Sequence, residues 1–384
     1  MSFDFATPSR IIFGIGTVKD VGKLAAQFGS RVFLVTSCGG AEPSSVINIL
    51  KTAGIQYSSF EVCGEPTVGL VLEAVQAAKR SQSDLVISFG GGSVIDTGKA
   101  VAALLNNPGD LMDYLEVVGL GRPLLQPSVP MIAIPTTAGT GSEVTRNAVL
   151  AVPEQKVKVS LRSPFMLPSL ALVDPELTYS LPPAVTASTG MDALTQVIEP
   201  YVSIRANEMV DLFCREGIMR ASRSLKLVYQ NGNFVQGRVD MAWTSLLGGL
   251  CLANAGLGAV HGFAAPIGGM FTAPHGAVCA RLLPLVVEAN FRALRERQLD
   301  NPAILRYAEI ARILTNNTKA TVEEGIEWLK QLCLDLQIPA LSDYGIRKAD
   351  IAILVQKSTA ASSMKANPIQ LTFTELADIL EKAL

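Results

Sequence analysis

The sequence predicts an α/β N-terminal domain with a mainly parallel sheet, followed by an all-α C-terminal domain. A chain of 384 residues is too long for one ordinary core, so two domains are expected. The first ~180 residues alternate short β-branched runs with helical patterns, as chains of βαβ units do. From Leu177 onward, apolar residues recur at the helical period of about 3.6. We place the domains at residues 1–181 and 182–384.

The strands are expected where short apolar runs end at a turn residue. Arg31–Thr36, Asp84–Phe89 and Met131–Ile134 are such runs, while Arg10–Gly14 suggests a hairpin strand. The later apolar periodicity predicts helices over residues 187–202, 207–228, 237–255, 303–314 and 322–336.

Composition and charge argue against several classes of protein. A hydrophobic content of 49% with 17% charged residues supports a large core and excludes a disordered chain. The net charge of −2, with dispersed basic residues, gives no reason to expect nucleic acid as a partner. The uncharged segment 241–280 is broken by glycine, proline, histidine and asparagine, so no membrane span is expected. Six cysteines without a C-x-x-C pair favour reduced thiols and a cytoplasmic location.

A glycine-rich loop, Gly90–Lys99, follows a predicted strand and opens a helix at Ala100. Its three glycines allow a bulky anion to approach, and the helix N-terminus presents free N–H groups. Ser93 is predicted to cap this helix, with Asp96 three residues further on. The loop matches neither the Walker A nor the G-x-G-x-x-G pattern. A pyrophosphate is the expected ligand, and an ordinary tight βα turn is the alternative.

A second loop, Pro135–Thr145, is also rich in glycine and hydroxyl residues and also follows a predicted strand. Two such loops at the carboxyl ends of parallel strands suit a dinucleotide laid across the edge of the sheet.

Asp192, Gln196 and the two histidines of the chain form the second candidate site. Asp192 and Gln196 are four residues apart and share one helix face. His261 and His275 both lie in the uncharged segment. One carboxylate and two imidazoles can hold Fe²⁺ or Zn²⁺ with a position left for a substrate oxygen. The alternative is that both histidines are structural.

The chain resembles the iron-containing (group III) alcohol dehydrogenases, which share the dehydroquinate synthase-like fold. The resemblance runs nearly end to end, and it rests on these segments: Phe13–Gly16, Gly90–Lys99, Pro135–Thr145, Asp174–Thr178, Gly190–Leu194 and Ala255–Gly276.

The resemblance implies roles for particular residues. It implies contacts to the cofactor from these positions: Gly91, Gly92, Ser93 and Asp96 at the pyrophosphate, Lys158 near a ribose, and Thr136, Thr137, Gly139 and Thr140 along the adenine and nicotinamide side. Asn147 would face the substrate, and Asp192, His261 and His275 would bind the metal. The chain departs from the family pattern at Gln196, where the fourth metal ligand is usually histidine, and at Ala265, where some members carry a proton-relaying histidine.

We therefore expect reversible hydride transfer between NAD(P)(H) and a small alcohol/aldehyde or hydroxy-/keto-acid pair, with the divalent metal as Lewis acid. Three alternatives remain: a metal-independent reductase resembling the maleylacetate reductases, a lyase or cyclase of the dehydroquinate synthase type, and a nucleotide-binding protein without catalysis. Ser37 follows the strand where many NAD-preferring relatives have an acidic residue, so NADP(H) is expected to bind at least comparably. A homodimer is expected through pairing of the segment Ile11–Phe13 with its copy.

Overall fold

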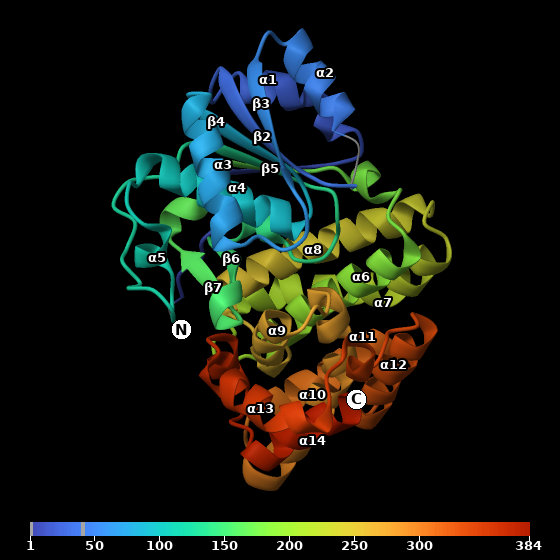
Figure 1. The fold of residues 1–384 in the computed structure, drawn as a ribbon. Coiled ribbons are helices and arrows are strands. Elements are labelled where there is room, and N and C mark those ends of the chain that lie inside the picture. The colour runs from blue at the N-terminus through green and yellow to red at the C-terminus, as the bar shows by residue number, and fades with distance from the viewer. Residues whose placement is uncertain (1–2, 40–42) are drawn as a thin grey trace. The chain divides into compact units, whose positions relative to one another are not determined.

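The computed structural model describes residues 3–39 and 43–384, which divide into two compact units (Figure 1). The α/β unit comprises residues 6–137 and 141–180. The helical unit comprises residues 181–384 together with the segment Ala138–Thr140 and residues 3–5. Phe5 packs against Phe213 of the helical unit, with their ring centroids 5.8 Å apart.

The α/β unit is built on a six-stranded parallel sheet with the strand order β1-β8-β5-β4-β2-β3. Its strands are β1 (Arg10–Phe13), β2 (Arg31–Ser37), β3 (Gln56–Val62), β4 (Leu85–Gly90), β5 (Met131–Pro135) and β8 (Leu170–Val173). A separate antiparallel pair consists of β6 (Asn147–Val152) and β7 (Val157–Arg162). The three predicted buried strands are confirmed to within a residue at each end, as β2, β4 and β5.

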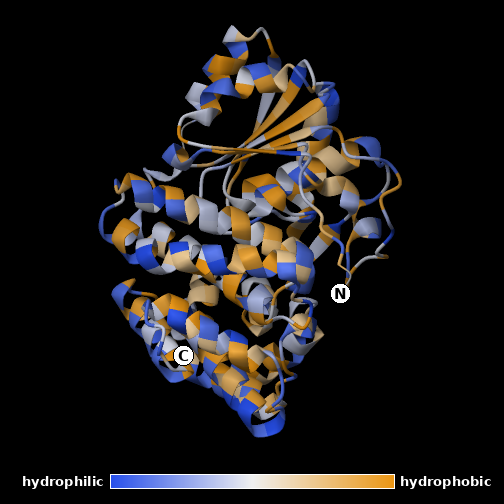
Figure 2. Cartoon of the chain, turned by 180° about the vertical axis from the view of Figure 1, so that it is seen from behind, coloured by the Kyte–Doolittle hydropathy of each residue, from blue (hydrophilic) through white to orange (hydrophobic). Residues whose placement is uncertain are grey.

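Helices cover both faces of this sheet. Along β2, Val32 and Leu34 join one hydrophobic core with α1 (Val21–Ala25) and α2 (Ser44–Thr52). Phe33 and Val35 join another core, with α3 (Val68–Arg80) and α4 (Gly92–Asn106). The short helix α5 (Leu111–Tyr114) adds Leu111 to this second core. Because alternate residues of a strand point to opposite faces, a strand that helices cover on both sides must be apolar along its length. Figure 2 shows strands of this sheet in orange, the colour of hydrophobic residues.

The predicted hairpin at Arg10–Gly14 is wrong. β1 pairs in parallel with β8, from Arg10 opposite Leu170 to Phe13 opposite Val173, and it stands at one end of the strand order. Gly16 has a φ of 78° and leads into a short 3-10 turn instead of a returning strand. The carboxylate of Asp174 holds this turn, accepting the N–H groups of Gly16 and Val18 at 3.1 Å each.

The expectation of reduced thiols also fails at one pair of cysteines. Cys38 and Cys63 are joined by a disulfide, with their Cα atoms 5.1 Å apart. They directly follow Ser37 and Val62, which lie opposite each other in the register of β2 and β3. Parallel pairing therefore brings the two cysteines within the range that a disulfide bridges. The other four cysteines are free and buried.

The helical unit has the all-α structure that the periodicity predicts. Its helices are α6 (Pro183–Val202), α7 (Glu208–Gln230), α8 (Val235–Ala255), α9 (Ala259–Met270), α10 (His275–Arg297), α11 (Ala303–Thr315), α12 (Val322–Asp335), α13 (Ile351–Ala360) and α14 (Phe373–Ala383). The five predicted helices correspond to α6, α7, α8, α11 and α12, and one hydrophobic core runs through the unit.

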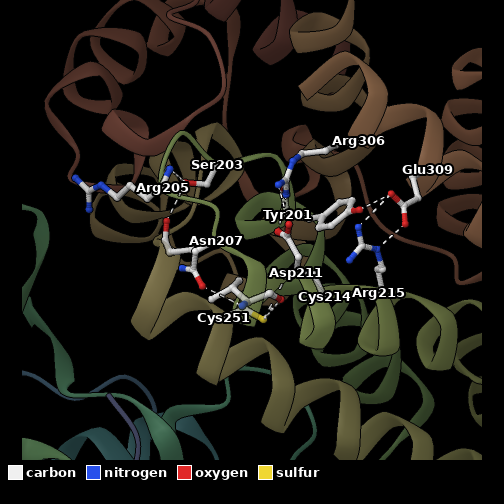
Figure 3. Close-up of polar contacts among 12 residues, drawn as sticks. Tyr201, Ser203, Arg205, Asn207, Asp211, Cys214, Arg215, Cys251, Arg306 and Glu309 are labelled. Carbon is white, nitrogen blue, oxygen red and sulfur yellow. Dashed lines mark hydrogen bonds and ion pairs between the residues drawn. The ribbon is translucent and has the colours of Figure 1, made fainter. Parts of the chain in front are cut away.

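A network of charged and aromatic side chains connects α6, α7 and α11 (Figure 3). Arg306 donates to both carboxylate oxygens of Asp211, at 2.5 and 2.7 Å, and to the carbonyl of Tyr201. Glu309 accepts the hydroxyl of Tyr201 and the guanidinium of Arg215, each at 2.5 Å. The two guanidinium groups lie 5.2 and 4.9 Å from the centroid of the Tyr201 ring, within the range of cation–π attraction. This network fixes the C-terminal end of α6.

No single helix in the described part of the chain is long and apolar enough to cross a membrane. The pair α8 and α9, bent by 98°, meets the length and composition requirement when taken together.

Candidate metal centre and cofactor loops

Asp192, His261 and His275 come together inside the helical unit, from α6, α9 and α10 respectively. His261 Nε2 lies 3.3 Å from Asp192 Oδ1, and His275 Nε2 lies 3.6 Å from the same oxygen. Asp192 and His261 are buried, and the side chain of His275 keeps about a third of its surface exposed. Pro274 directly precedes α10, so His275 stands on the first residue of its helix.

Cys279 is a fourth member of this cluster, and it is absent from the site that the sequence predicts. One ligand atom from each of Asp192, His261, His275 and Cys279 lies within 4.8 Å of the others. Cys279 Sγ is 3.6 Å from His275 Nε2 and 3.9 Å from His261 Nε2. His275 and Cys279 are four residues apart on α10 and so share one helix face. That spacing is the sequence signal that could have found Cys279.

Gln196 is buried one turn after Asp192 on α6, and its amide is partly engaged. Its Nε2 donates to the carbonyl of Gly139 at 3.1 Å, within the helical unit. Among the described residues, Gln196 Oε1 and Asp192 Oδ1 are buried oxygens without a hydrogen-bond partner. Buried polar atoms in proteins almost always have partners, so these two oxygens mark a place where something else binds.

Glu199 holds the ring of His261 from the side opposite Asp192. The Nδ1 atom of His261 lies 2.6 Å from Glu199 Oε2, and Glu199 Oε1 accepts the N–H of Val260 at 2.7 Å. An ionised carboxylate only accepts hydrogen bonds, so Nδ1 carries the proton. Nε2 is then left to face Asp192 and Cys279. Histidines that bind metals through one ring nitrogen usually donate the N–H of the other to a carboxylate in this way, which fixes the ring.

The electrostatics of the cluster favour positive charge. Burial is the largest influence on His275 and opposes its protonation, but the neighbouring Cys279 and Asp192 side chains outweigh it and raise its pKa to about 9. The pKa of His261 is likewise raised, against the effect of burial, by Cys279, Asp192 and Glu199. Burial would raise the pKa of Asp192, but the two histidines lower it. Nitrogen, carboxylate and sulfur donors that together attract a cation are a set that fits Fe²⁺ or Zn²⁺.

The two glycine-rich loops lie next to each other in the α/β unit. Gly90 at the end of β4 is opposite Pro135 at the end of β5, and the N–H of Thr136 donates to the carbonyl of Gly90 at 3.0 Å. A Cβ atom built at Gly91 would lie 3.3 Å from the hydroxyl of Thr137, so side-chain bulk there would crowd the second loop. The adjacency of these loops at the carboxyl edge of the sheet, inferred from the sequence, is therefore observed.

The helix after the first loop begins earlier than predicted. α4 starts at Gly92 instead of Ala100, and Gly91 is its N-cap residue. Ser93 lies inside the first turn and makes no capping hydrogen bond, so its predicted capping role is wrong. The free N–H groups of this turn come from the glycines and Ser93, which still suits an anion.

Asp96 holds the second loop in place. Its Oδ1 accepts the hydroxyl of Ser142 at 2.5 Å and its Oδ2 accepts the N–H of Val149 at 2.9 Å. The ammonium group of the buried Lys99 lies 3.0 Å from Asp96 Oδ1 and also donates to the carbonyl of Ser142. Contact between Asp96 and a cofactor stays a prediction.

The remaining predicted site residues divide between the two units. Ser37 ends β2, and Asn147 begins β6, where its carbonyl accepts from Lys99. Lys158 is on β7 with its side chain only 6% exposed, and its ammonium lies 3.1 Å from Glu65, so it is not a solvated surface charge. Gly139 and Thr140 belong to the helical unit, whereas Thr136 and Thr137 belong to the α/β unit.

The parallel sheet has helices on both faces and two adjacent glycine-rich loops, and the helical unit carries a cluster of side chains that could hold a metal ion. These features are consistent with a metal-dependent oxidoreductase. The chain belongs to the iron-containing alcohol dehydrogenase family. The profile of the iron-containing alcohol dehydrogenases matches residues 8–175, and that of the C-terminal region of the same family matches residues 186–384.

Individual relatives agree over the whole chain. The 1,3-propanediol dehydrogenase of Klebsiella pneumoniae is 34% identical, over 99% of this chain and 98% of the relative. The NAD-dependent methanol dehydrogenase of Bacillus methanolicus is 32% identical, over 99% of this chain and 100% of the relative. A solved structure of 1,3-propanediol oxidoreductase superimposes with a TM-score of 0.92 at 34% identity, covering 100% of both chains. The protein is therefore an enzyme of the alcohol dehydrogenase and aldehyde reductase type, which decides against the lyase and the non-catalytic binding protein.

Proposed function

We propose that the enzyme transfers hydride reversibly between NAD(P)(H) and a small primary alcohol or its aldehyde, with a divalent metal held by Asp192, His261 and His275. The observation that carries this proposal is the buried cluster of these three side chains in a member of the iron-containing family. Relatives named for 1,3-propanediol and for methanol support a small alcohol as substrate. A hydroxy-/keto-acid pair would undergo the same chemistry.

The side chains of the helical unit would hold the metal and leave a position for the substrate oxygen. When bound, a divalent metal acts as a Lewis acid toward that oxygen, and the nicotinamide supplies or accepts the hydride. Glu199 keeps Nε2 of His261 directed at Asp192. Burial of Asp192 and His261 excludes water from their side of the cluster. Because Ala265 stands where some members have a histidine, the proton of the substrate's hydroxyl group would have to leave through water.

The cofactor would bind on the two loops at the carboxyl edge of the sheet. Gly91, Gly92 and Ser93 offer the free N–H groups of α4 to the pyrophosphate. Thr136 and Thr137 would line the adenine and nicotinamide side of the cofactor. Lys158, on β7 of the same unit, would reach a ribose. Ser37, a neutral hydroxyl at the end of β2, leaves room for a 2′-phosphate, so both NAD(H) and NADP(H) are proposed as cofactors. The proposed assembly is a homodimer. The proposed location is the cytoplasm, which the four free, buried cysteines support and the disulfide between Cys38 and Cys63 does not.

A metal-independent reductase, similar in this respect to the maleylacetate reductases, is the second candidate. The observation in its favour is Gln196, whose amide donates to Gly139 where the family usually has an imidazole ligand. In that case His261 and His275 would donate hydrogen bonds to the substrate.

One assay separates these functions. Absorbance of NADH and of NADPH is followed against a panel of short-chain aldehydes and keto acids, with the enzyme as purified, after chelation, and after addition of Fe²⁺, Zn²⁺ or Mn²⁺. The proposed function requires turnover that chelation abolishes and added metal restores. Full activity in chelator would favour the metal-independent reductase, and no cofactor oxidation with any carbonyl compound would contradict both.

A further inference from the structure

We propose that the thiolate of Cys279 is the fourth protein ligand of the metal centre and takes the place that Gln196 leaves open. The inference rests on the proposed function, because it assumes a divalent metal at Asp192, His261 and His275. It adds a donor of a different chemical kind, on a different helix, to the set that the family resemblance implies.

The distances between the donor atoms support four protein ligands, with the substrate oxygen as a fifth donor, a coordination number that catalytic zinc also adopts. Oδ1 of Asp192 is 3.3 Å from His261 Nε2 and 3.6 Å from His275 Nε2. Cys279 Sγ is 3.9 and 3.6 Å from the same two nitrogens. A tetrahedral ion with bonds of about 2.0–2.3 Å separates its donors by about 3.3–3.6 Å. These four pairs of donors thus lie at nearly the spacing that one ion requires, and all four donor atoms lie within 4.8 Å of one another.

The surroundings of Cys279 differ from those of a thiol that only fills space. Cys333, another buried free cysteine, has its Sγ directed at the carbonyl of Ala280 at 3.3 Å. Cys279 Sγ instead faces two imidazole nitrogens, and one of them, His261 Nε2, is held there by Glu199. Asp192 Oδ1, buried and without a hydrogen bond among the described residues, is directed at the same point. A thiol, two imidazole nitrogens and a carboxylate oxygen that converge in this way can together hold one divalent cation.

Gln196 is the poorer candidate for the fourth position. Its Nε2 donates to the carbonyl of Gly139 and its Oε1 has no hydrogen-bond partner among the described residues, but an amide oxygen is a neutral donor that binds Fe²⁺ and Zn²⁺ less strongly than imidazole or thiolate. The pair Asp192 and Gln196 on α6 is matched by the pair His275 and Cys279 on α10, each four residues apart. The donor lost on one helix is supplied on the other.

This ligand set has consequences for the choice of metal. Asp192 and a Cys279 thiolate together carry two negative charges, which neutralise a divalent ion. Thiolate is a soft donor, and zinc in particular accepts mixed sulfur and nitrogen sets at catalytic sites. We expect the enzyme to retain Zn²⁺ more tightly than Fe²⁺.

The test is made on the full-length protein, stripped with chelator and reloaded with one equivalent of Co²⁺ or Zn²⁺. Thiolate bound to Co²⁺ gives a near-ultraviolet charge-transfer band that oxygen and nitrogen donors do not give. We expect this band in the wild type, its loss in Cys279→Ala, and its retention in Cys333→Ala, the matched buried thiol. The affinity of Cys279→Ala for Zn²⁺, measured by competition with a chelating dye, should fall by more than about 100-fold, beyond the range for outer-shell partners.

X-ray absorption of the zinc-loaded wild type is independent of any variant, and it should show one sulfur neighbour at about 2.3 Å. Stoichiometric Co²⁺ without the thiolate band, or zinc with only nitrogen and oxygen neighbours, would overturn the assignment of Cys279 and leave the proposed function standing. A wild type that binds neither ion would overturn both the assignment and the metal-dependent part of the proposed function.

Discussion

Glu199 and His261 form a short hydrogen bond of 2.6 Å between Oε2 and Nδ1, buried in the helical unit. The other carboxylate oxygen of Glu199 accepts the N–H of Val260, the residue before His261. Both contacts act on the start of α9, so one carboxylate fixes the orientation of the ring and the position of the backbone that carries it. Glu199 is thus a positioning residue for the metal centre.

Replacing Glu199 with glutamine should weaken metal binding without removing a ligand. The amide oxygen can still accept from Nδ1, but the negative charge that makes Nε2 a better donor is lost. Zinc affinity, measured by dye competition, should fall by roughly 10–100-fold. Glu288→Gln is the control, since Glu288 is paired with Lys330 on the exposed side of α10. Equal affinity in Glu199→Gln and the wild type would show that the contact is only structural.

Replacing Gln196 with histidine should strengthen the metal centre. One ring nitrogen can donate to the carbonyl of Gly139, as Nε2 of Gln196 does at 3.1 Å, and the other can bind the ion. We expect the affinity for Zn²⁺ to rise by about tenfold or more, because changes to residues that only contact a metal ligand already alter metal affinity by about 10–100-fold. The gain should be larger in the Cys279→Ala background, where a ligand position is open. Isothermal titration with Zn²⁺ measures both, and a loss of affinity in each background would contradict the expectation.

The elements of secondary structure were predictable because their signals are local. β2, β4 and β5 are continuous apolar runs, and the long helices of the C-terminal unit repeat their apolar residues at the helical period. The hairpin at Arg10–Gly14 was predicted wrongly because β1 pairs with Leu170 and its neighbours, which no local pattern can indicate. The disulfide between Cys38 and Cys63 depends in the same way on the register of two strands.

The metal centre was only partly predictable. Two histidines in an uncharged segment and a nearby carboxylate suggested the site, but a buried cysteine in a helix resembles any small apolar residue. Cys279 gains its significance from its distance to His275 and His261 in space. Glu199 was likewise invisible, because its partner His261 lies 62 residues later in the chain.

Ser37 should control the choice between NAD(H) and NADP(H). The residue ends β2, where a carboxylate would bind the adenosine ribose and repel a 2′-phosphate. We expect comparable dissociation constants for the two cofactors in the wild type and a preference for NAD(H) of at least about tenfold in Ser37→Asp, worth about 1.4 kcal/mol. Fluorescence titration with NADH and NADPH gives both constants. Ser37→Asn is the matched control without charge. A large preference of the wild type for NAD(H) would contradict the prediction.

Glu143 should make the stability of the enzyme depend on pH. Burial raises the pKa of this carboxyl group from 4.5 to about 7, although its own backbone N–H and Lys99 oppose the shift. Between these values the folded protein keeps a proton that the unfolded chain has released, so the free energy of unfolding falls as pH rises through this window and then levels off. In Glu143→Gln this loss should disappear, which would stabilise the variant relative to the wild type by up to about 3 kcal/mol above the window.

Urea unfolding at about pH 5 and about pH 8 measures the effect, with Glu154→Gln as the control because Glu154 is exposed in the β6–β7 turn. The difference between Glu143→Gln and the wild type should grow with pH. A difference that is constant or that shrinks would mean that Glu143 is ionised in the folded protein throughout.

The assembly prediction concerns β1, which stands at the end of the strand order in the six-stranded sheet. An edge strand can pair with its own copy across a two-fold axis, and a lysine on such a strand is a common means of preventing this. Ile12 packs against the hydrophobic core that the sheet forms with α1 and α2, whereas Ile11 is not among the residues of that core. Ile11→Lys should therefore leave the fold intact and place two like charges close together in the pair, which would disfavour dimerisation.

Multi-angle light scattering at micromolar concentration should report a dimer for the wild type and monomer for Ile11→Lys. Ile15→Lys is the matched control, because Ile15 is 50% exposed and lies just beyond the strand, so the same charge there should leave the dimer intact. Circular dichroism shows whether each variant is folded. A monomeric wild type would refute the assembly itself. A dimer that persists in Ile11→Lys would mean that the copies associate through another surface, because β1 cannot then be the strand that pairs.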